Sequence, residues 1–147
     1  MIMELLSPDS VHRLEDCILG LADHHNSIPS AFSGIYPFLP VDSILSAMAD
    51  QVRDGRAVIE IISDDGKIAG FSKVSFDHTY GILDFLFVRE EYRGRGYGKI
   101  LMDRVMDLFR QRGVDLIDIK VVSGNDAERF YQRYGFQIRS VIMTRRI

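Results

Sequence analysis

Cysteine is almost absent from this sequence, and its scarcity excludes two common ways of stabilising a small protein. The single cysteine, Cys17, cannot form an internal disulfide, and it leaves no cysteine-rich zinc site. We predict that its thiol is buried, as free cysteines usually are. A chain of 147 residues is long enough to bury a core unaided, so we expect folding to need no metal and no disulfide.

Segments that direct a protein to a membrane are also lacking. No run of about 18 apolar residues could span a bilayer, and residues 1–6 lack the basic start and the long apolar core of a signal peptide. We therefore expect a cytoplasmic protein that has no membrane partner.

The sequence has no large excess of charge of either sign. Its 18 Lys and Arg residues and 21 Asp and Glu residues leave a net charge of −3, which gives no general attraction to nucleic acid or anionic lipid. Basic residues gather only locally, at positions 89–99 and 145–146. Because the chain has no internal repeat and no long linker, we expect residues 1–147 to form a single domain.

The sequence does contain an alternation of strand and helix patterns. Strands are predicted at residues 2–6, 57–62, 68–76, 82–88, 115–122 and 136–143. Helices are predicted where apolar residues recur at helical spacing, at residues 11–21, 44–52, 97–108 and 127–134. The turn Asp64-Asp65-Gly66 predicts a hairpin, and the nearly uniform apolar run 82–88 is typical of a strand covered on both faces. This order predicts an α/β or α+β fold, in which helices cover a mixed sheet.

The most informative segment is rich in glycine and basic residues. Residues 93–99 read Arg-Gly-Arg-Gly-Tyr-Gly-Lys and connect the predicted strand 82–88 to a helix that begins near Tyr97. A helix N-terminus presents free backbone N–H groups and the positive end of the helix dipole. Glycines let a phosphate approach the main chain, and the basic side chains raise the local potential. The segment therefore predicts a site for a phosphorylated ligand.

The glycine spacing identifies the kind of phosphate site. Two nucleotide motifs are excluded, because no Lys-Ser or Lys-Thr pair follows the glycines and no third glycine stands at the position that the dinucleotide fingerprint requires. Arg93, Gly96 and Gly98 instead fit the pattern of arginine or glutamine, two residues, glycine, one residue, and glycine or alanine. A second pattern follows at residues 125–136, which read Asn-Asp-Ala, two residues, Phe-Tyr, three residues and Gly-Phe. With these two signatures, the chain resembles the GNAT superfamily of N-acetyltransferases over its whole length.

The resemblance implies a fold, a cosubstrate and a set of binding residues. The fold would be a GNAT-like, mostly antiparallel sheet of six to seven strands with about four helices, and the cosubstrate would be acetyl-CoA without any metal. The pyrophosphate of acetyl-CoA would bind at Arg93, Gly94, Arg95, Gly96, Tyr97, Gly98 and Lys99. The pantetheine arm would pair, like an extra strand, with main-chain groups of Leu86, Phe87 and Val88. Asn125 would lie near the cofactor, although its position equally fits the cap of the following helix.

The reaction that the resemblance implies needs a proton acceptor, because an amine with a pKa of about 10.4 is protonated at pH 7. Asp84 is the one ionisable side chain in the run 82–88, and burial could raise its pKa into a useful range. The alternative is that Asp84 faces solvent or pairs with a basic residue. Many family members carry a glutamate at a slightly different place on this strand, where this chain has Ile82. Further candidates for the proton acceptor are Glu60, His78, His24 and His25.

Tyr131 is the candidate proton donor. It stands four residues before Gly135, where a family tyrosine protonates the departing CoA sulfur. The alternative is that Tyr131 only packs beside Phe130, and Tyr134 is expected to pack or to lie at the surface.

The acceptor is the least determined part of the reaction. Residues 26–40 and 77–81 lie where family members bind it, and the aromatic content of the first segment suggests a partly apolar pocket. Because acidic residues are scattered, we expect no marked preference for a polyamine or a basic tail. A small amine, a protein N-terminus or a lysine side chain would each fit, and the acyl group could be longer than acetyl. The resemblance also implies that a homodimer through the terminal strand could form.

Two other classes of function stay open. One is an acyl-CoA-binding sensor without turnover. The other is an RNA-binding module that uses Arg89, Arg93, Arg95 and Lys99. The second is disfavoured, because only Tyr92 and Tyr97 are interleaved with the basic residues as stacking platforms.

Overall fold

The computed structural model describes residues 1–147. The strands are β1 (Ile2–Leu5), β2 (Ala57–Asp64), β3 (Lys67–Asp77), β4 (Tyr80–Val88) and β5 (Leu116–Ile119). The α-helices are α1 (Glu15–Ser27), α2 (Val41–Arg53), α3 (Tyr97–Gln111) and α4 (Ala127–Gln132), and the 3-10 helices are η1 (Pro8–Leu14) and η2 (Glu90–Tyr92). None of the helices is long and apolar enough to cross a membrane.

The five strands form one sheet in the order β1-β2-β3-β4-β5. Strands β1 to β4 pair with one another in antiparallel fashion, and β5 is parallel to β4. Asp65 and Gly66 connect β2 to β3 with positive φ angles of 51° and 77°, which is the geometry of a tight two-residue hairpin turn. The predicted hairpin and the predicted mixed, mostly antiparallel sheet are therefore confirmed.

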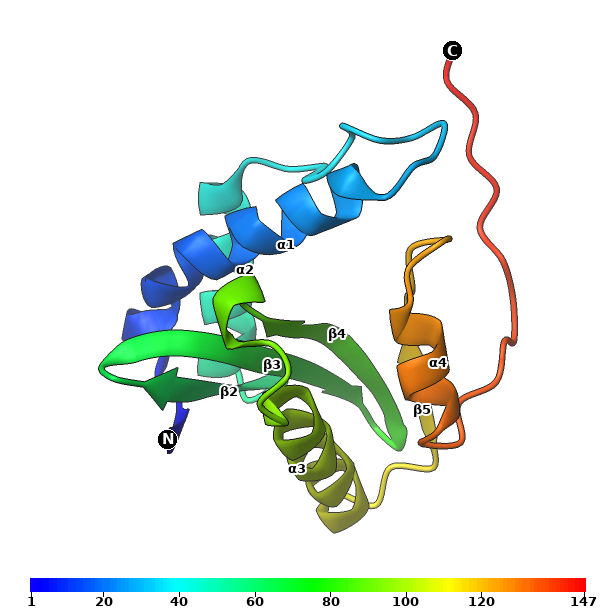
Figure 1. Ribbon diagram of the computed structural model, residues 1–147. Helices are drawn as coiled ribbons and strands as arrows, with labels where there is room; N and C mark the ends of the chain where they lie inside the picture. Colours follow the sequence, from blue (N-terminus) through cyan, green and yellow to red (C-terminus); the bar gives the residue numbers. More distant parts are fainter.

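Helices cover both faces of the sheet (Figure 1). On one face, α1 and α2 pack on β2, β3 and β4 through a cluster that contains the buried Cys17, Phe71 and Phe87. On the other face, α3 packs on β3 and β4 through a cluster that contains Val74 and Phe109. The two clusters arise because successive residues of a strand point to opposite faces. The prediction of a buried cysteine is confirmed.

The predicted last strand is wrong. Residues 136–147 have no regular structure, so the sheet has five strands and not the expected six to seven. Ile138, Val141 and Met143 are 71%, 78% and 93% exposed. The apolar residues at 141–143 are contiguous and so cannot form one buried face, and a strand needs a neighbour to satisfy its backbone.

β4 is not covered on both faces as its composition predicted. Ile82 is 37% exposed, whereas Leu83 beside it is 4% exposed. Ile82 lies in the half of β4 that pairs with β5, whereas the second half has no strand on its outer side and borders a cleft, where Leu86 and Val88 are half-buried. Some apolar residues of this half therefore line the cleft and do not pack in the core.

Candidate active site

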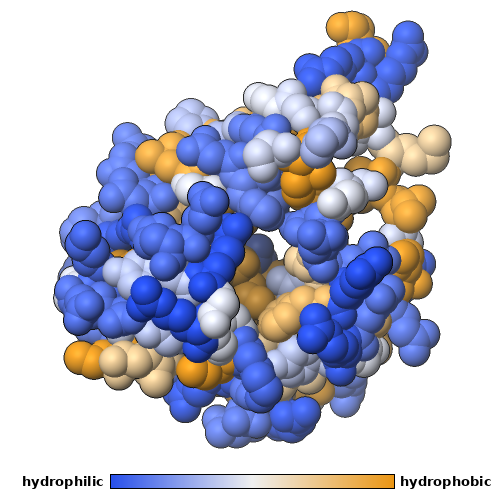
Figure 2. Space-filling model, in the orientation of Figure 1, coloured by the Kyte–Doolittle hydropathy of each residue, from blue (hydrophilic) through white to orange (hydrophobic).

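The cleft opens where the sheet splits. β4 and β5 are paired only from Tyr80 to Leu83, and the register of β3 against β4 shifts between Lys73 and Val74, which makes a β-bulge at Asp84. Beyond this point the two strands separate and leave a cleft of about 500 Å³. Figure 2 shows the hollow in the middle of the visible face, with apolar residues in its depth and hydrophilic residues around it.

Nearly all of the predicted site residues meet in this cleft. It is lined by Asp84, Leu86, Phe87, Val88, Arg93, Gly94, Gly96, Tyr97, Gly98, Lys99, Asn125 and Tyr131. Arg95 is the one predicted cofactor-binding residue that does not line it.

The glycine loop, residues 93–99, presents its backbone to the cleft. Gly94 and Gly96 have φ angles of 81° and 83°, and a Cβ added to either residue would meet no atom within 4 Å. Gly96 is the N-cap of α3, and the N–H groups of residues 94–99 have no acceptor within the chain. This run of free amides at a helix N-terminus has the geometry of an anion site, which is the backbone geometry that the glycines predicted.

Asp64 explains why Arg95 points away from the cleft. One oxygen of its carboxylate, Oδ2, accepts hydrogen bonds from the Tyr97 hydroxyl at 2.6 Å and from the Arg95 guanidinium at 3.0 Å. The hydrogen bond from Tyr97, followed by the charge of Arg95, holds the pKa of Asp64 below its usual value, and the same bond raises the pKa of Tyr97. Sequence reasoning missed this role, because Asp64 was interpreted only as part of the hairpin turn.

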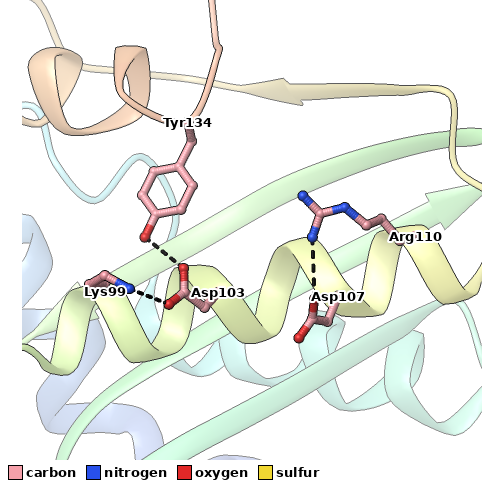
Figure 3. A network of polar contacts seen from close by, with 5 residues as sticks. All are labelled: Lys99, Asp103, Asp107, Arg110 and Tyr134. Atoms are coloured by element: carbon pink, nitrogen blue, oxygen red, sulfur yellow. Dashed lines mark hydrogen bonds and ion pairs between the residues drawn. The ribbon is translucent and has the colours of Figure 1, made fainter.

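Lys99 and Tyr134 meet at the first turns of α3 (Figure 3). The Asp103 carboxylate accepts a hydrogen bond from Lys99 Nζ at 2.7 Å and another from the Tyr134 hydroxyl at 3.0 Å, whereas Asp107 pairs with Arg110 further along the helix. Tyr134 also packs against Phe130, as predicted, with ring centres 5.4 Å apart. The Asp103 carboxylate therefore joins the segment after α4 to α3.

Arg93 fastens the glycine loop to the end of β4. Its Nε donates a hydrogen bond to the Val88 carbonyl at 3.1 Å, and its guanidinium lies 6.0 Å from the centre of the Phe87 ring. The free edge of β4 at residues 86–88 and the glycine loop therefore form one continuous wall of the cleft.

Asp84 is paired with a buried lysine. Lys73 Nζ donates a hydrogen bond to the Asp84 carboxylate at 2.8 Å, and the two side chains are 4% and 23% exposed. The structure thus has the alternative arrangement stated above, in which a basic residue pairs with Asp84, although Asp84 still lines the cleft. Sequence reasoning missed Lys73, which gave no signal of its own within the strand pattern.

The structure separates the other candidate proton acceptors. Glu60 lies on the α3 side, where Arg104 binds its carboxylate with hydrogen bonds of 2.7 and 3.0 Å, and His78 is an exposed turn residue. Neither of them lines the cleft, whereas His24 and His25 both do. Two of the four candidates therefore lie away from the cleft.

Tyr131 and Asn125 lie on the α4 side of the cleft. The Tyr131 ring packs against Phe130 and Phe136, while its hydroxyl makes no hydrogen bond within the chain, and burial raises its pKa to about 12. The N-cap of α4 is Asp126, and Asn125, one residue before it, accepts a hydrogen bond through Oδ1 from the Ala127 N–H at 3.1 Å and also lines the cleft. Both interpretations of Asn125 are therefore compatible with its position.

The comparison with known proteins identifies the family. A sequence model described as the acetyltransferase (GNAT) family matches residues 21–136. The chain belongs to the GNAT acetyltransferase family. The predicted resemblance is thus confirmed, and the glycine loop and the cleft lie within the matched residues.

Individual relatives match only part of this GNAT chain. It is 31% identical to streptothricin acetyltransferase from Streptomyces lavendulae over 86 residues, and the alignment covers 56% of this chain and 45% of that protein. It is 32% identical to mycothiol acetyltransferase from Beutenbergia cavernae over 95 residues, and this alignment covers 58% of this chain and 32% of that protein. The chain spans less than half the length of the curated relatives it matches.

Solved structures share the whole fold. A predicted acetyltransferase from Clostridium acetobutylicum, solved with acetyl-CoA, has a TM-score of 0.77 at 16% sequence identity. The superposition covers 99% of this chain and 95% of that one. At such low identity the likeness establishes the GNAT fold of this chain.

Proposed function

We propose that this protein transfers the acetyl group of acetyl-CoA to a primary amine, by direct attack of the amine on the thioester. One observation carries the proposal: the free amides of residues 94–99 open into the same cleft as the free edge of β4 and the Tyr131 side chain. A phosphorylated thioester of extended shape would need an anion site for its phosphates, an unpaired strand edge for its amides and a proton donor near its sulfur. The acetyl-CoA bound to the Clostridium acetobutylicum protein of the same fold supports this cosubstrate.

The glycine loop would bind the pyrophosphate, and β4 would bind the pantetheine arm. Backbone N–H groups at residues 94–99 supply the hydrogen bonds, and Arg93 and Lys99 add positive charge at the rim of the cleft. Main-chain groups of residues 86–88 that have no partner on β5 would pair with the amides of the pantetheine arm. This division of roles makes the backbone the main cofactor-binding element.

Tyr131 would protonate the departing CoA sulfur. With a pKa of about 12 its hydroxyl stays protonated at any physiological pH, so a proton is always available. Giving that proton to a thiolate whose conjugate acid keeps a pKa of about 8.5 is uphill by about 5 kcal/mol. The same burial that raises the pKa of Tyr131 also disfavours a free thiolate beside it, which reduces this difference.

Asp84 would orient the amine. Its charge is already compensated by Lys73, so the pair can accept an N–H hydrogen bond without strongly stabilising the ammonium form of the acceptor. The acceptor would be a small amine, a protein N-terminus or a lysine side chain that enters beside Asp84.

The experiment that tests the proposal uses acetyl-CoA and a panel of alkylamines and short peptides. CoA thiol release should accompany formation of the N-acetyl product, measured by mass spectrometry, and the substitution Tyr131→Phe should lower kcat by about 100-fold. Tyr134→Phe is the matched control, because it removes a hydroxyl that bonds Asp103 outside the cleft and should leave kcat within about twofold.

The second candidate function is an acyl-CoA-binding domain without turnover. It is favoured by the fact that the glycine loop and β4 could bind the cofactor without any contribution from Tyr131 or Asp84. It predicts that acetyl-CoA binds but that no amine in the panel increases thiol release. That result, or full activity of Tyr131→Phe with an accepted amine, would contradict the proposed mechanism.

A further inference from the structure

We propose that His25 takes the proton from the acceptor ammonium, while the Lys73–Asp84 pair orients the amine. The inference rests on the proposed function, because it names the proton acceptor of the same reaction. It is carried by three observations: the position of α1 across the cleft, the setting of the His25 ring, and the ion pair that already engages Asp84.

Helix α1 brings His25 over the cleft. A Cβ added to Gly20 would lie only 3.1 Å from the Phe87 ring, so α1 approaches β4 closely at this point. Leu21 follows Gly20 and packs against the cluster that contains Phe87, and His25 lies one turn further on the same face as Leu21. Leu21 and His25 both line the cleft, together with residues of β4 and α4.

The His25 ring is held in place without using its nitrogens. It lies edge-on to the Tyr36 ring, with centres 5.2 Å apart, and neither ring nitrogen makes a hydrogen bond within the chain. Asn26 fixes the loop that carries Tyr36: its Nδ2 donates to the Tyr36 carbonyl at 2.8 Å, and its Oδ1 accepts from the N–H groups of Gly34 and Tyr36. The imidazole is therefore positioned and free to accept a proton.

Burial, followed by the charge of the neighbouring His24, lowers the pKa of His25 from its usual 6.5. The imidazole is therefore neutral at pH 7, which is the form that can take a proton. The other titratable groups around the cleft on this side are His24 on α1, Tyr36 in the following loop, the Lys73–Asp84 pair on the sheet, Lys120 after β5 and Tyr131 on α4.

Asp84 is already engaged by Lys73. The Lys73 side chain is 4% exposed, and the Asp84 carboxylate is its only hydrogen-bond partner. The Asp84 carboxylate is the counter-charge of this buried ammonium, so it is committed to the ion pair. His25 has no such partner to lose.

The protons of the reaction balance with these residues. The acceptor R–NH₃⁺ gives one proton to His25, and the resulting R–NH₂ forms a C–N bond with the thioester carbonyl carbon as the C–S bond breaks. The departing sulfur takes a proton from the Tyr131 hydroxyl. Tyr131 then regains a proton from the nitrogen that has attacked, and the one hydrogen left on this nitrogen becomes the amide N–H. His25 releases its proton to solvent, so the net products are the amide, CoA thiol and one proton.

The test compares two nucleophiles of different basicity on the intact protein. The first is the alkylamine that gives the fastest thiol release, and the second is its aminooxy counterpart, which is uncharged at pH 7. For the alkylamine, kcat/KM of the wild type should fall as the pH is lowered through a pKa below 6.5. In His25→Gln this fall in kcat/KM at low pH, the acid limb of the pH profile, should disappear. At pH 7 the substitution should lower kcat/KM by about 100-fold for the alkylamine, but by less than about threefold for the aminooxy compound.

The controls separate a chemical role from a structural one. His12→Gln, on the exposed η1, should leave both nucleophiles unaffected, and added imidazole should restore activity to His25→Ala. Equal slowing of both nucleophiles by His25→Gln, or an unchanged acid limb, would overturn the assignment while leaving the acetyltransferase proposal intact. Loss of the acid limb in Asp84→Asn, with the limb unchanged in His25→Gln, would assign the proton to Asp84. A wild type that binds acetyl-CoA but acetylates no amine would overturn both proposals.

Discussion

Asp64 controls the side chains of the glycine loop from the end of β2. It binds Arg95 and Tyr97 together, so Arg95 is held away from the cleft while Tyr97 and the backbone of the loop line it. The residue that shapes the predicted phosphate site is therefore far from that site in the sequence.

Replacing Asp64 should weaken acetyl-CoA binding more than it slows the reaction. In Asp64→Ala both hydrogen bonds are lost and Arg95 is free to move, so we expect the Kd for acetyl-CoA to rise about tenfold with kcat within about twofold. Calorimetric titration and steady-state kinetics measure the two effects. Asp50→Ala, which removes an exposed ion pair with Arg53 on α2, is the control, and an Asp64→Ala protein with wild-type affinity would contradict this role.

The Lys73–Asp84 pair should respond asymmetrically to substitution. Asp84→Ala leaves the Lys73 ammonium buried without a partner and should cost about 3–5 kcal/mol of unfolding free energy. Lys73→Met should cost clearly less, because it leaves the Asp84 carboxylate, which is 23% exposed and can be hydrated. Urea unfolding of the two variants gives the comparison, and equal losses would show that the burial of Lys73 does not determine the energy.

The site residues that could be predicted from sequence are those with a local signal. Gly96 and Tyr131 stand at fixed places in two short motifs, and both line the cleft as predicted. Asp64 and Lys73 bond to partners on other elements, and no spacing in the sequence connects them to those partners. Their roles depend on which elements pack together, which a pattern along the chain does not contain.

At the scale of the element, the N-terminus of α3 requires the backbone conformation of Gly96. Its φ of 83° strains any residue with a Cβ by about 1–2 kcal/mol, so Gly96→Ala should distort the turn and misalign the free amides. We expect the Kd for acetyl-CoA to rise at least about tenfold.

Gly113 offers a matched control for this substitution. It follows α3 with a φ of 67°, so Gly113→Ala introduces a similar strain at the opposite end of the same helix. Thermal unfolding should show similar destabilisation of both variants, and calorimetry should show weaker acetyl-CoA binding only in Gly96→Ala. If both variants bound equally well, the loop backbone would not be the anion site.

The hairpin and the missing last strand show what limits prediction of an element. Asp65 and Gly66 determine the β2–β3 turn by themselves, so this part of the sheet could be predicted from the sequence. Residues 136–143 have strand-forming composition, but a strand also needs a partner edge and one consistent apolar face. β5 has only four residues, and Val141 and Ile142 are adjacent, so neither condition is met.

At the scale of the whole molecule, the cleft separates two parts of the protein, and one of them is held by far fewer packing contacts and strand pairs than the other. The sheet from β1 to β4 is enclosed by α1, α2 and α3, whereas β5 pairs with β4 over only four residues. α4 is held through the packing of Phe130 and Tyr131 and, just beyond its end, through the Tyr134 hydrogen bond to Asp103. A ligand that contacts both β4 and α4 would therefore connect the less supported part to the rest.

Acetyl-CoA should accordingly stabilise the fold as a whole and α4 most of all. At 100 times its Kd a ligand adds about 2.7 kcal/mol, which for a chain of this size raises Tm by about 5–10 °C. Hydrogen exchange should slow most in residues 116–132 and in the glycine loop, and least in β2 and β3, which are already protected by the core. At the same ligand concentration Gly96→Ala should show a smaller shift in Tm, and an equal shift in both proteins would mean that acetyl-CoA binds elsewhere.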